Sequence, residues 1–156
     1  GVVVVSVSYR LGVFGYLSID GPVAPEGTGN FGVLDQQSAM RWVKANIGAF
    51  GGDAGKVLLF GESAGALNVC THLVVPSSRG LFHAAGMESR SCQGRALAAA
   101  TAPNSSVGSP ALLRGVGCDD MACLRRASID TIMGASATAN NNRDWMPTID
   151  GVTVRL

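Results

Sequence analysis

The stretch from Val57 to Gly65 constrains the fold of this chain more than any other part of it. An apolar run leads into a Gly-x-Ser-x-Gly motif, and a helical pattern follows as far as Pro76. This order predicts a strand, a sharp turn with Ser63 at its apex, and then a helix, an arrangement known as a nucleophile elbow. Side chains at positions 61 and 65 would collide with neighbouring backbone in such a turn, which explains glycine at both.

The predicted turn makes Ser63 a candidate nucleophile. Its hydroxyl would stand clear of the sheet, with the N-terminus of the following helix beside it. Because free N–H groups and the positive end of the helix dipole favour an oxyanion, the amide of Ala64 is the expected oxyanion donor. Glu62 has two open interpretations, an electrostatic role beside the serine or a satisfied carboxylate without one. The alternative for the whole motif is a glycine-rich turn with a solvated serine.

The elements around the elbow predict an α/β fold. Residues 2–9 form a β-branched run that is typical of a central strand buried on both faces, and residues 56–60 read as another buried strand. Residues 33–47 carry an apolar stripe at helical spacing, with Trp42 expected in the core. A further strand could span residues 84–87. The alternation of strands and helices indicates a mostly parallel sheet with right-handed crossovers.

The remaining sequence predicts connections and short helices. Residues 10–30 are rich in glycine and proline and read as a surface connection, although the apolar part at 11–17 should pack down. Further helices are expected over residues 93–102, from Ser109 onward, and over residues 119–126 and 128–133. Residues 140–144 read as a turn, and residues 145–152 as an extended segment.

Composition excludes several classes of protein. The chain has 156 residues, 47% of them hydrophobic and 15% charged, which is typical of a globular domain with a sizeable core. A net charge of +1 gives no indication of nucleic-acid binding, and no apolar run is long enough to span a membrane. The chain opens inside a predicted strand without Met or a signal peptide. We therefore expect residues 1–156 to be a piece of a longer polypeptide.

Four cysteines indicate disulfides rather than a metal site. Cys118 and Cys123 are close enough to close a small loop, whereas the partners of Cys70 and Cys92 stay open. The spacing does not resemble a paired zinc site, and only two histidines could assist. An Asn-Ser-Ser acceptor pattern for glycosylation begins at Asn104. Disulfides and glycosylation together favour a secreted protein.

Several blocks of the sequence resemble the type-B carboxylesterase and cholinesterase family. They are residues 2–17, 29–37, 50–53 and 61–65. The resemblance implies the α/β-hydrolase fold and hydrolysis of a small-molecule ester through an acyl-enzyme on Ser63, with Ala64 as an oxyanion donor and with no metal or cofactor. It also implies a disulfide between Cys118 and Cys123, here around an unusually short loop.

The resemblance implies that residues 1–156 are a fragment of a single α/β-hydrolase domain that lacks its N- and C-terminal parts, and that the other catalytic groups lie in those parts. It implies that the Gly-Gly oxyanion loop precedes residue 1, and that the acid and the histidine of the triad follow residue 156. His72 and His83 are expected to be structural, because the catalytic histidine comes late in this fold and His72 would lie more than two helical turns from Ser63. Three hypotheses follow: an ester hydrolase, an inert 156-residue product of one, or a non-catalytic cholinesterase-like adhesion protein.

Overall fold

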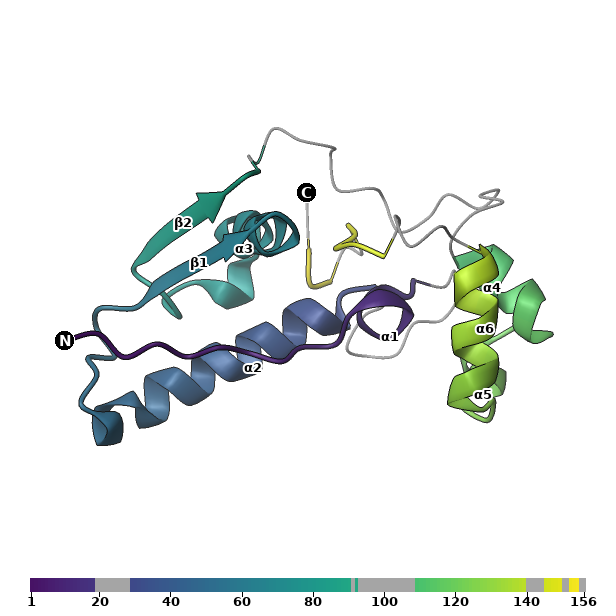
Figure 1. Cartoon of the computed structure of the whole chain (residues 1–156), viewed down its shortest axis with the longest axis horizontal. Coiled ribbons are helices and arrows are strands. Elements are labelled where there is room, and N and C mark those ends of the chain that lie inside the picture. The colour runs from purple at the N-terminus through teal and green to yellow at the C-terminus, as the bar shows by residue number, and fades with distance from the viewer. Residues whose placement is uncertain (19–28, 91, 93–108, 140–144, 150–151, 155–156) are drawn as a thin grey trace.

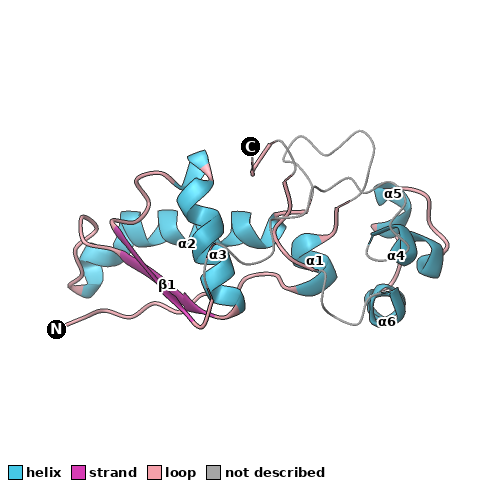
Figure 2. Cartoon of the chain, turned by 90° about the horizontal axis from the view of Figure 1, so that it is seen from above, coloured by secondary structure: helices cyan, strands magenta, loops and turns pink. Residues whose placement is uncertain are grey.

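The computed structural model describes residues 1–18, 29–90, 92, 109–139, 145–149 and 152–154. The helix expected over residues 93–102, the turn at residues 140–144 and the glycosylation pattern at Asn104 lie outside these residues. Figures 1 and 2 show two strands near one end of the molecule and a group of helices at the other, with a long helix running along its length.

The two strands form a parallel pair, as predicted. Strand β1 (Leu58–Glu62) and strand β2 (Ala84–Glu88) run in register from Leu58 opposite Ala84 to Glu62 opposite Glu88. Helix α3 (Ala64–Val74) connects them and packs against both strands (Figure 1). A strand, a crossover helix and a parallel strand make this an α/β fold.

The sheet is covered on one face, which corrects the prediction of a fully buried strand at residues 56–60. Side chains along a strand alternate between its faces. Gly61 faces the first turn of α3, whereas Leu58 and Phe60 are 57% and 60% exposed on the other face. In the part of the chain that the structure describes, nothing covers this outer face.

The prediction of a central strand at residues 2–9 is wrong in this structure. The segment is extended but unpaired, and all of its residues except Tyr9 are exposed. In Figure 1 it runs along the long helix, apart from β1 and β2. A β-branched run makes ladder hydrogen bonds only beside another strand, and β1 and β2 pair with each other.

Helix α2 (Phe31–Asn46) is the long helix, and the 3₁₀ turn η1 (Ile47–Phe50) follows it. Its buried face includes Val33, Met40 and two glutamines, Gln36 and Gln37. Trp42, which was expected in the core, is 48% exposed, and its ring lies 5.7 Å from that of Phe50. The buried face of α2 is therefore partly polar, and the Trp42 side chain lies outside it.

Residues 11–17 pack down as expected, but as a single helical turn, α1 (Gly12–Tyr16). Val13, Tyr16 and Leu17 are buried there together with Val33 of α2. Gly32 permits this contact, because a Cβ at that position would lie 2.8 Å from the Tyr16 hydroxyl. Arg10, just before α1, forms a double hydrogen bond with Asp35 of α2 at 2.8 Å, which lowers the pKa of that carboxyl.

The second half of the chain adds three helices to the same core. They are α4 (Ser109–Val116), α5 (Met121–Leu124) and α6 (Ile129–Ala139). Leu112, Leu124 and Trp145 join the buried cluster around α1. The predicted disulfide between Cys118 and Cys123 is present and encloses the start of α5, where Asp120 accepts a hydrogen bond from the Cys123 amide. No helix of the described residues is long and apolar enough to cross a bilayer.

Candidate active site

Ser63 occupies the strained turn that the motif predicts. It lies between the last residue of β1 and the first residue of α3, with φ 51° and ψ −106°. A positive φ is unfavourable for a residue with a Cβ and persists only where the surrounding structure enforces it. Ser63 is exposed at the C-terminal end of the sheet. The backbone thus presents the Ser63 side chain outside the sheet edge.

Hydrogen bonds from both sides hold this conformation. The Ser63 amide donates to the carbonyl oxygen of Glu88 in β2 at 2.9 Å. The Ser63 carbonyl accepts from the Leu67 amide at 3.1 Å, which is the first helical bond of α3. Ser63 is therefore fixed by the neighbouring strand and by its own helix at once. Ser89, directly after Glu88, also has a positive φ of 60° and is exposed.

The two glycines of the motif play different parts. A Cβ on Gly61 would lie 2.5 Å from the carbonyl carbon of Gly65 and 2.7 Å from its oxygen. The strand and the helix therefore approach as closely as predicted, and only glycine fits at Gly61. For Gly65 the expected collision is absent, since a Cβ there would meet no atom of the described residues within 4 Å.

The first turn of α3 provides N–H groups beside Ser63. The first helical bond uses the Leu67 amide, so the amides of Ala64, Gly65 and Ala66 precede the helical hydrogen-bond pattern. Ala64 is exposed next to the serine. An oxygen that develops negative charge near Ser63 Oγ would be stabilised by these donors and by the positive end of the helix.

Glu62 is exposed at the end of β1, in register with Glu88 of β2. Register neighbours of a parallel pair lie on the same face about 5 Å apart. Two carboxylates therefore stand side by side at the sheet edge next to Ser63. Their negative charges make this edge acidic, but no contact of Glu62 with Ser63 defines a role for it.

Neither imidazole of the chain lies beside Ser63. His83 accepts a hydrogen bond from the Val57 amide through Nδ1, at the end of the sheet opposite to the serine. His72 lies near the C-terminal end of α3, nine residues or roughly 13 Å along the axis from Ser63. His72 is 3% exposed, and burial lowers its pKa to about 4. The described residues thus bring Ser63 and Ala64 together, with neither histidine beside them.

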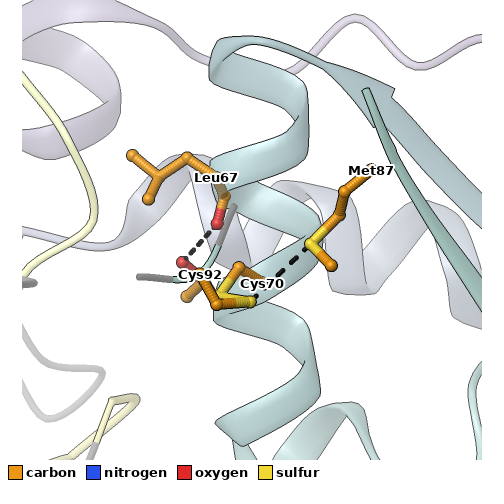
Figure 3. The surroundings of a disulfide bond; sticks show 5 residues. Leu67, Cys70, Met87 and Cys92 are labelled. Carbon is orange, nitrogen blue, oxygen red and sulfur yellow. Dashed lines mark hydrogen bonds between the residues drawn. A yellow bond between two sulfur atoms is a disulfide. The ribbon is translucent and has the colours of Figure 1, made fainter. Parts of the chain in front are cut away.

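A second disulfide lies on α3, the helix that follows the elbow. Cys70 of α3 is bonded to Cys92, with their Cα atoms 5.5 Å apart. Figure 3 shows this bond beside Leu67 and Met87, whose sulfur lies 3.7 Å from Cys92 Sγ. The bond ties α3 covalently to the segment that leaves β2. The sequence had left the partners of both cysteines open.

Two cavities among the described residues lie away from the serine. A cavity of about 520 Å³ separates α1 and the start of α2 from α5 and α6, with Phe14, Phe31 and Ile132 among its walls. A smaller one, of about 210 Å³, lies beside η2 (Pro76–Ser78). Within the described ranges, no group of three or more His, Cys, Asp or Glu residues could hold a metal ion.

Comparison with known proteins agrees with this geometry. The sequence profile described as the carboxylesterase family matches residues 1–155. A solved carboxylesterase, EST55 of Geobacillus stearothermophilus, superposes with a TM-score of 0.78 at 32% identity over 93% of this chain. A strand, a strained serine and a helix in this order, within that fold, define part of an α/β-hydrolase. The chain belongs to the carboxylesterase family.

Curated relatives include cholinesterases. Acetylcholinesterase 4 of Caenorhabditis briggsae is 44% identical over 81% of the chain, and cholinesterase 2 of Branchiostoma lanceolatum is 37% identical over 99%. Cocaine esterase of Oryctolagus cuniculus is 54% identical over 56%. The matched part is 21%, 48% and 16% of these relatives, respectively, and 32% of the EST55 chain. The chain thus spans half or less of the proteins it resembles.

Sequence reasoning missed the groups that support the elbow. The carbonyl of Glu88 was not expected beside Ser63, because a main-chain acceptor carries no side-chain signal. The buried amides Gln36 and Asn68 were also missed, since a search for apolar stripes passes over them, whereas His72 was expected to be structural. The signal that could have indicated them was the presence of polar residues at core positions of α2 and α3, because buried polar groups need hydrogen-bond partners.

The glycine pair gives a matched test of the elbow. Gly61→Ala forces a Cβ onto the backbone of Gly65 and should lower the free energy of unfolding by about 1–3 kcal/mol. Gly65→Ala, on the open side, should stay within about 1 kcal/mol of wild type. Denaturant unfolding of the two variants measures the difference. Equal unfolding midpoints would contradict the close approach.

The buried His72 predicts a pH dependence of stability. Its pKa is about 4 in the folded protein against 6.5 when unfolded, so the unfolded state binds more protons between these values. The contribution of neutral His72 to the free energy of unfolding is complete above pH 6.5. It declines as the pH falls toward 4, by about 3 kcal/mol in all. Urea unfolding of wild type and His72→Gln should show a steeper loss between pH 6.5 and 4.5 in wild type. Parallel profiles would contradict a neutral buried imidazole.

Proposed function

We propose that the protein of which these residues form part is a serine carboxylic-ester hydrolase that acts through an acyl-enzyme on Ser63. The observation that supports this most is the backbone of Ser63, with φ 51° at the junction of β1 and α3. A strained turn at a sheet edge has no structural need for serine, yet it suits a nucleophile that must stand beside helix N–H groups. Family membership supports the same proposal.

In the proposed reaction, Ser63 Oγ attacks the carbonyl carbon of the ester while its proton passes to a histidine base. The tetrahedral oxyanion accepts hydrogen bonds from the Ala64 amide and from a second donor. The intermediate collapses, the alcohol leaves with the proton from the histidine, and the acyl group stays on Ser63. Water activated by the same base attacks the acyl carbon and releases the acid.

We place the base outside residues 1–156. His72 and His83 are the two histidines of the chain, and both make structural hydrogen bonds away from Ser63. Without a base, a serine hydroxyl is a weak nucleophile. The 156-residue chain alone is therefore proposed to be inert, and the activity to need the longer polypeptide that the length of the relatives indicates.

The substrate class is a small-molecule ester, as family membership supports. Two disulfides among the described residues suit an oxidising compartment, so we propose that the protein enters the secretory pathway. The alternative of a non-catalytic adhesion protein finds less support, because the strained serine is present and not replaced.

Labelling with a fluorophosphonate tests the nucleophile. In the complete polypeptide, the probe should modify Ser63, and Ser63→Ala should abolish labelling and lower ester hydrolysis by at least about a thousand-fold. Ser89→Ala is the matched control, since Ser89 is also exposed with a positive φ. Mass spectrometry of the labelled peptide reads the site. A folded polypeptide that takes no label at Ser63 would favour the adhesion protein.

A further inference from the structure

The buried polar residues of α3 include Asn68 and His72. They are four residues apart, so they lie on the same side of the helix. Their exposed fractions are 5% and 3%. A buried polar group stabilises a fold only when it is hydrogen-bonded, and an apolar residue would bury more simply in either place. The partners of these side chains therefore indicate what they do.

Asn68 connects α3 to the N-terminal part of the chain. Its Oδ1 accepts a hydrogen bond from the Tyr16 hydroxyl of α1 at 3.1 Å. Its Nδ2 donates to the Tyr9 hydroxyl, also at 3.1 Å. Both ends of the amide are thus engaged by different segments, and burial raises the pKa of Tyr16, which keeps that hydroxyl protonated as a donor.

His72 connects α3 to two further segments. Its Nε2 lies 2.8 Å from Gln36 Oε1 of α2, and its Nδ1 lies 2.8 Å from Ser78 Oγ of η2. The amide oxygen of Gln36 accepts, so Nε2 carries the proton and Nδ1 accepts from the Ser78 hydroxyl. Gln37 Nε2 donates to the same Ser78 oxygen at 2.9 Å. Both ring nitrogens are therefore engaged.

We propose that Asn68 and His72 are positioning residues that set the rotation and axial position of α3, and through them the Ser63 hydroxyl and the Ala64 amide. This inference rests on the proposed esterase function. Apolar packing is non-directional and tolerates small slides of a helix, whereas hydrogen bonds fix direction and distance. Four such bonds to four separate segments leave α3 one orientation.

The geometry of α3 explains how Asn68 and His72 could affect Ser63 from a distance. Ser63 precedes the first helical residue, so any rotation of the helix moves its Oγ and the Ala64 amide together relative to Glu88. Cys70 lies on the side of α3 away from Asn68 and His72, since residues two apart point about 200° from each other. Its disulfide to Cys92 (Figure 3) fixes one point and acts as a pivot. The hydrogen bonds of Asn68 and His72 on the opposite face then prevent rotation of α3 about that point.

The test compares phosphonylation rates in the complete polypeptide, well below the melting temperature of every variant. Asn68→Leu and His72→Phe remove the bonds and should each lower the second-order rate with a fluorophosphonate about tenfold or more, because small displacements of reacting groups are costly. His72→Gln keeps an N–H donor toward Gln36 and should recover the rate to within about threefold of wild type. Val69→Ala, in a buried apolar site on the same helix, should lower the melting temperature with less than about a twofold change in rate.

The outcomes separate the two proposals. A wild-type polypeptide that does not react at Ser63 overturns the proposed function and this inference with it. A reactive wild type whose Asn68 and His72 variants lose no more rate than Val69→Ala overturns the inference alone. If Asn68→Leu fails to fold, Tyr16→Phe takes its place, because it removes one hydroxyl that bonds Asn68 without altering α3. Tyr16→Phe should show an intermediate loss of rate. An unchanged rate would contradict the positioning role of Asn68.

Discussion

Two main-chain hydrogen bonds at Ser63 are the interactions on which the elbow depends. The amide of Ser63 is held by Glu88 of the neighbouring strand, and its carbonyl by Leu67 of its own helix. A φ of 51° costs on the order of 1–3 kcal/mol, which these bonds and the packing of α3 must offset. The strain is also what exposes the hydroxyl and places the N–H groups of α3 beside it. The backbone conformation of Ser63 therefore affects both the stability of the elbow and the position of its reactive groups.

The local order of elements could be predicted because it depends on short-range sequence signals. The apolar run before Gly61, the glycine there and the helical pattern after Ser63 each specify their own conformation. The parallel pairing of β1 with β2 followed from the crossover helix between them. The disulfide between Cys118 and Cys123 was implied by the family resemblance, and its five-residue separation suits a bridge over the first turn of α5.

The failures share one physical cause, which is that burial depends on what lies next to an element. Residues 2–9 and the outer face of β1 have the composition of buried strands, but no described segment pairs with the first or covers the second. The hydrophobicity of Trp42 predicted the core, yet its position on α2 points outward toward Phe50. The polar residues Gln36 and Asn68, which were not expected in the core, are buried for the converse reason, because each has a hydrogen-bond partner on another segment.

The most direct test is a crystal structure of the complete polypeptide after reaction with a fluorophosphonate. The account predicts phosphorus bonded to Ser63 Oγ and a phosphonyl oxygen at about 2.7–3.1 Å from the Ala64 amide nitrogen. It also predicts that Ser63 keeps its positive φ and its bond to the Glu88 carbonyl. A phosphonyl oxygen turned away from the Ala64 amide, or a Ser63 backbone relaxed to a negative φ, would contradict the claim that the strained turn creates the reactive site.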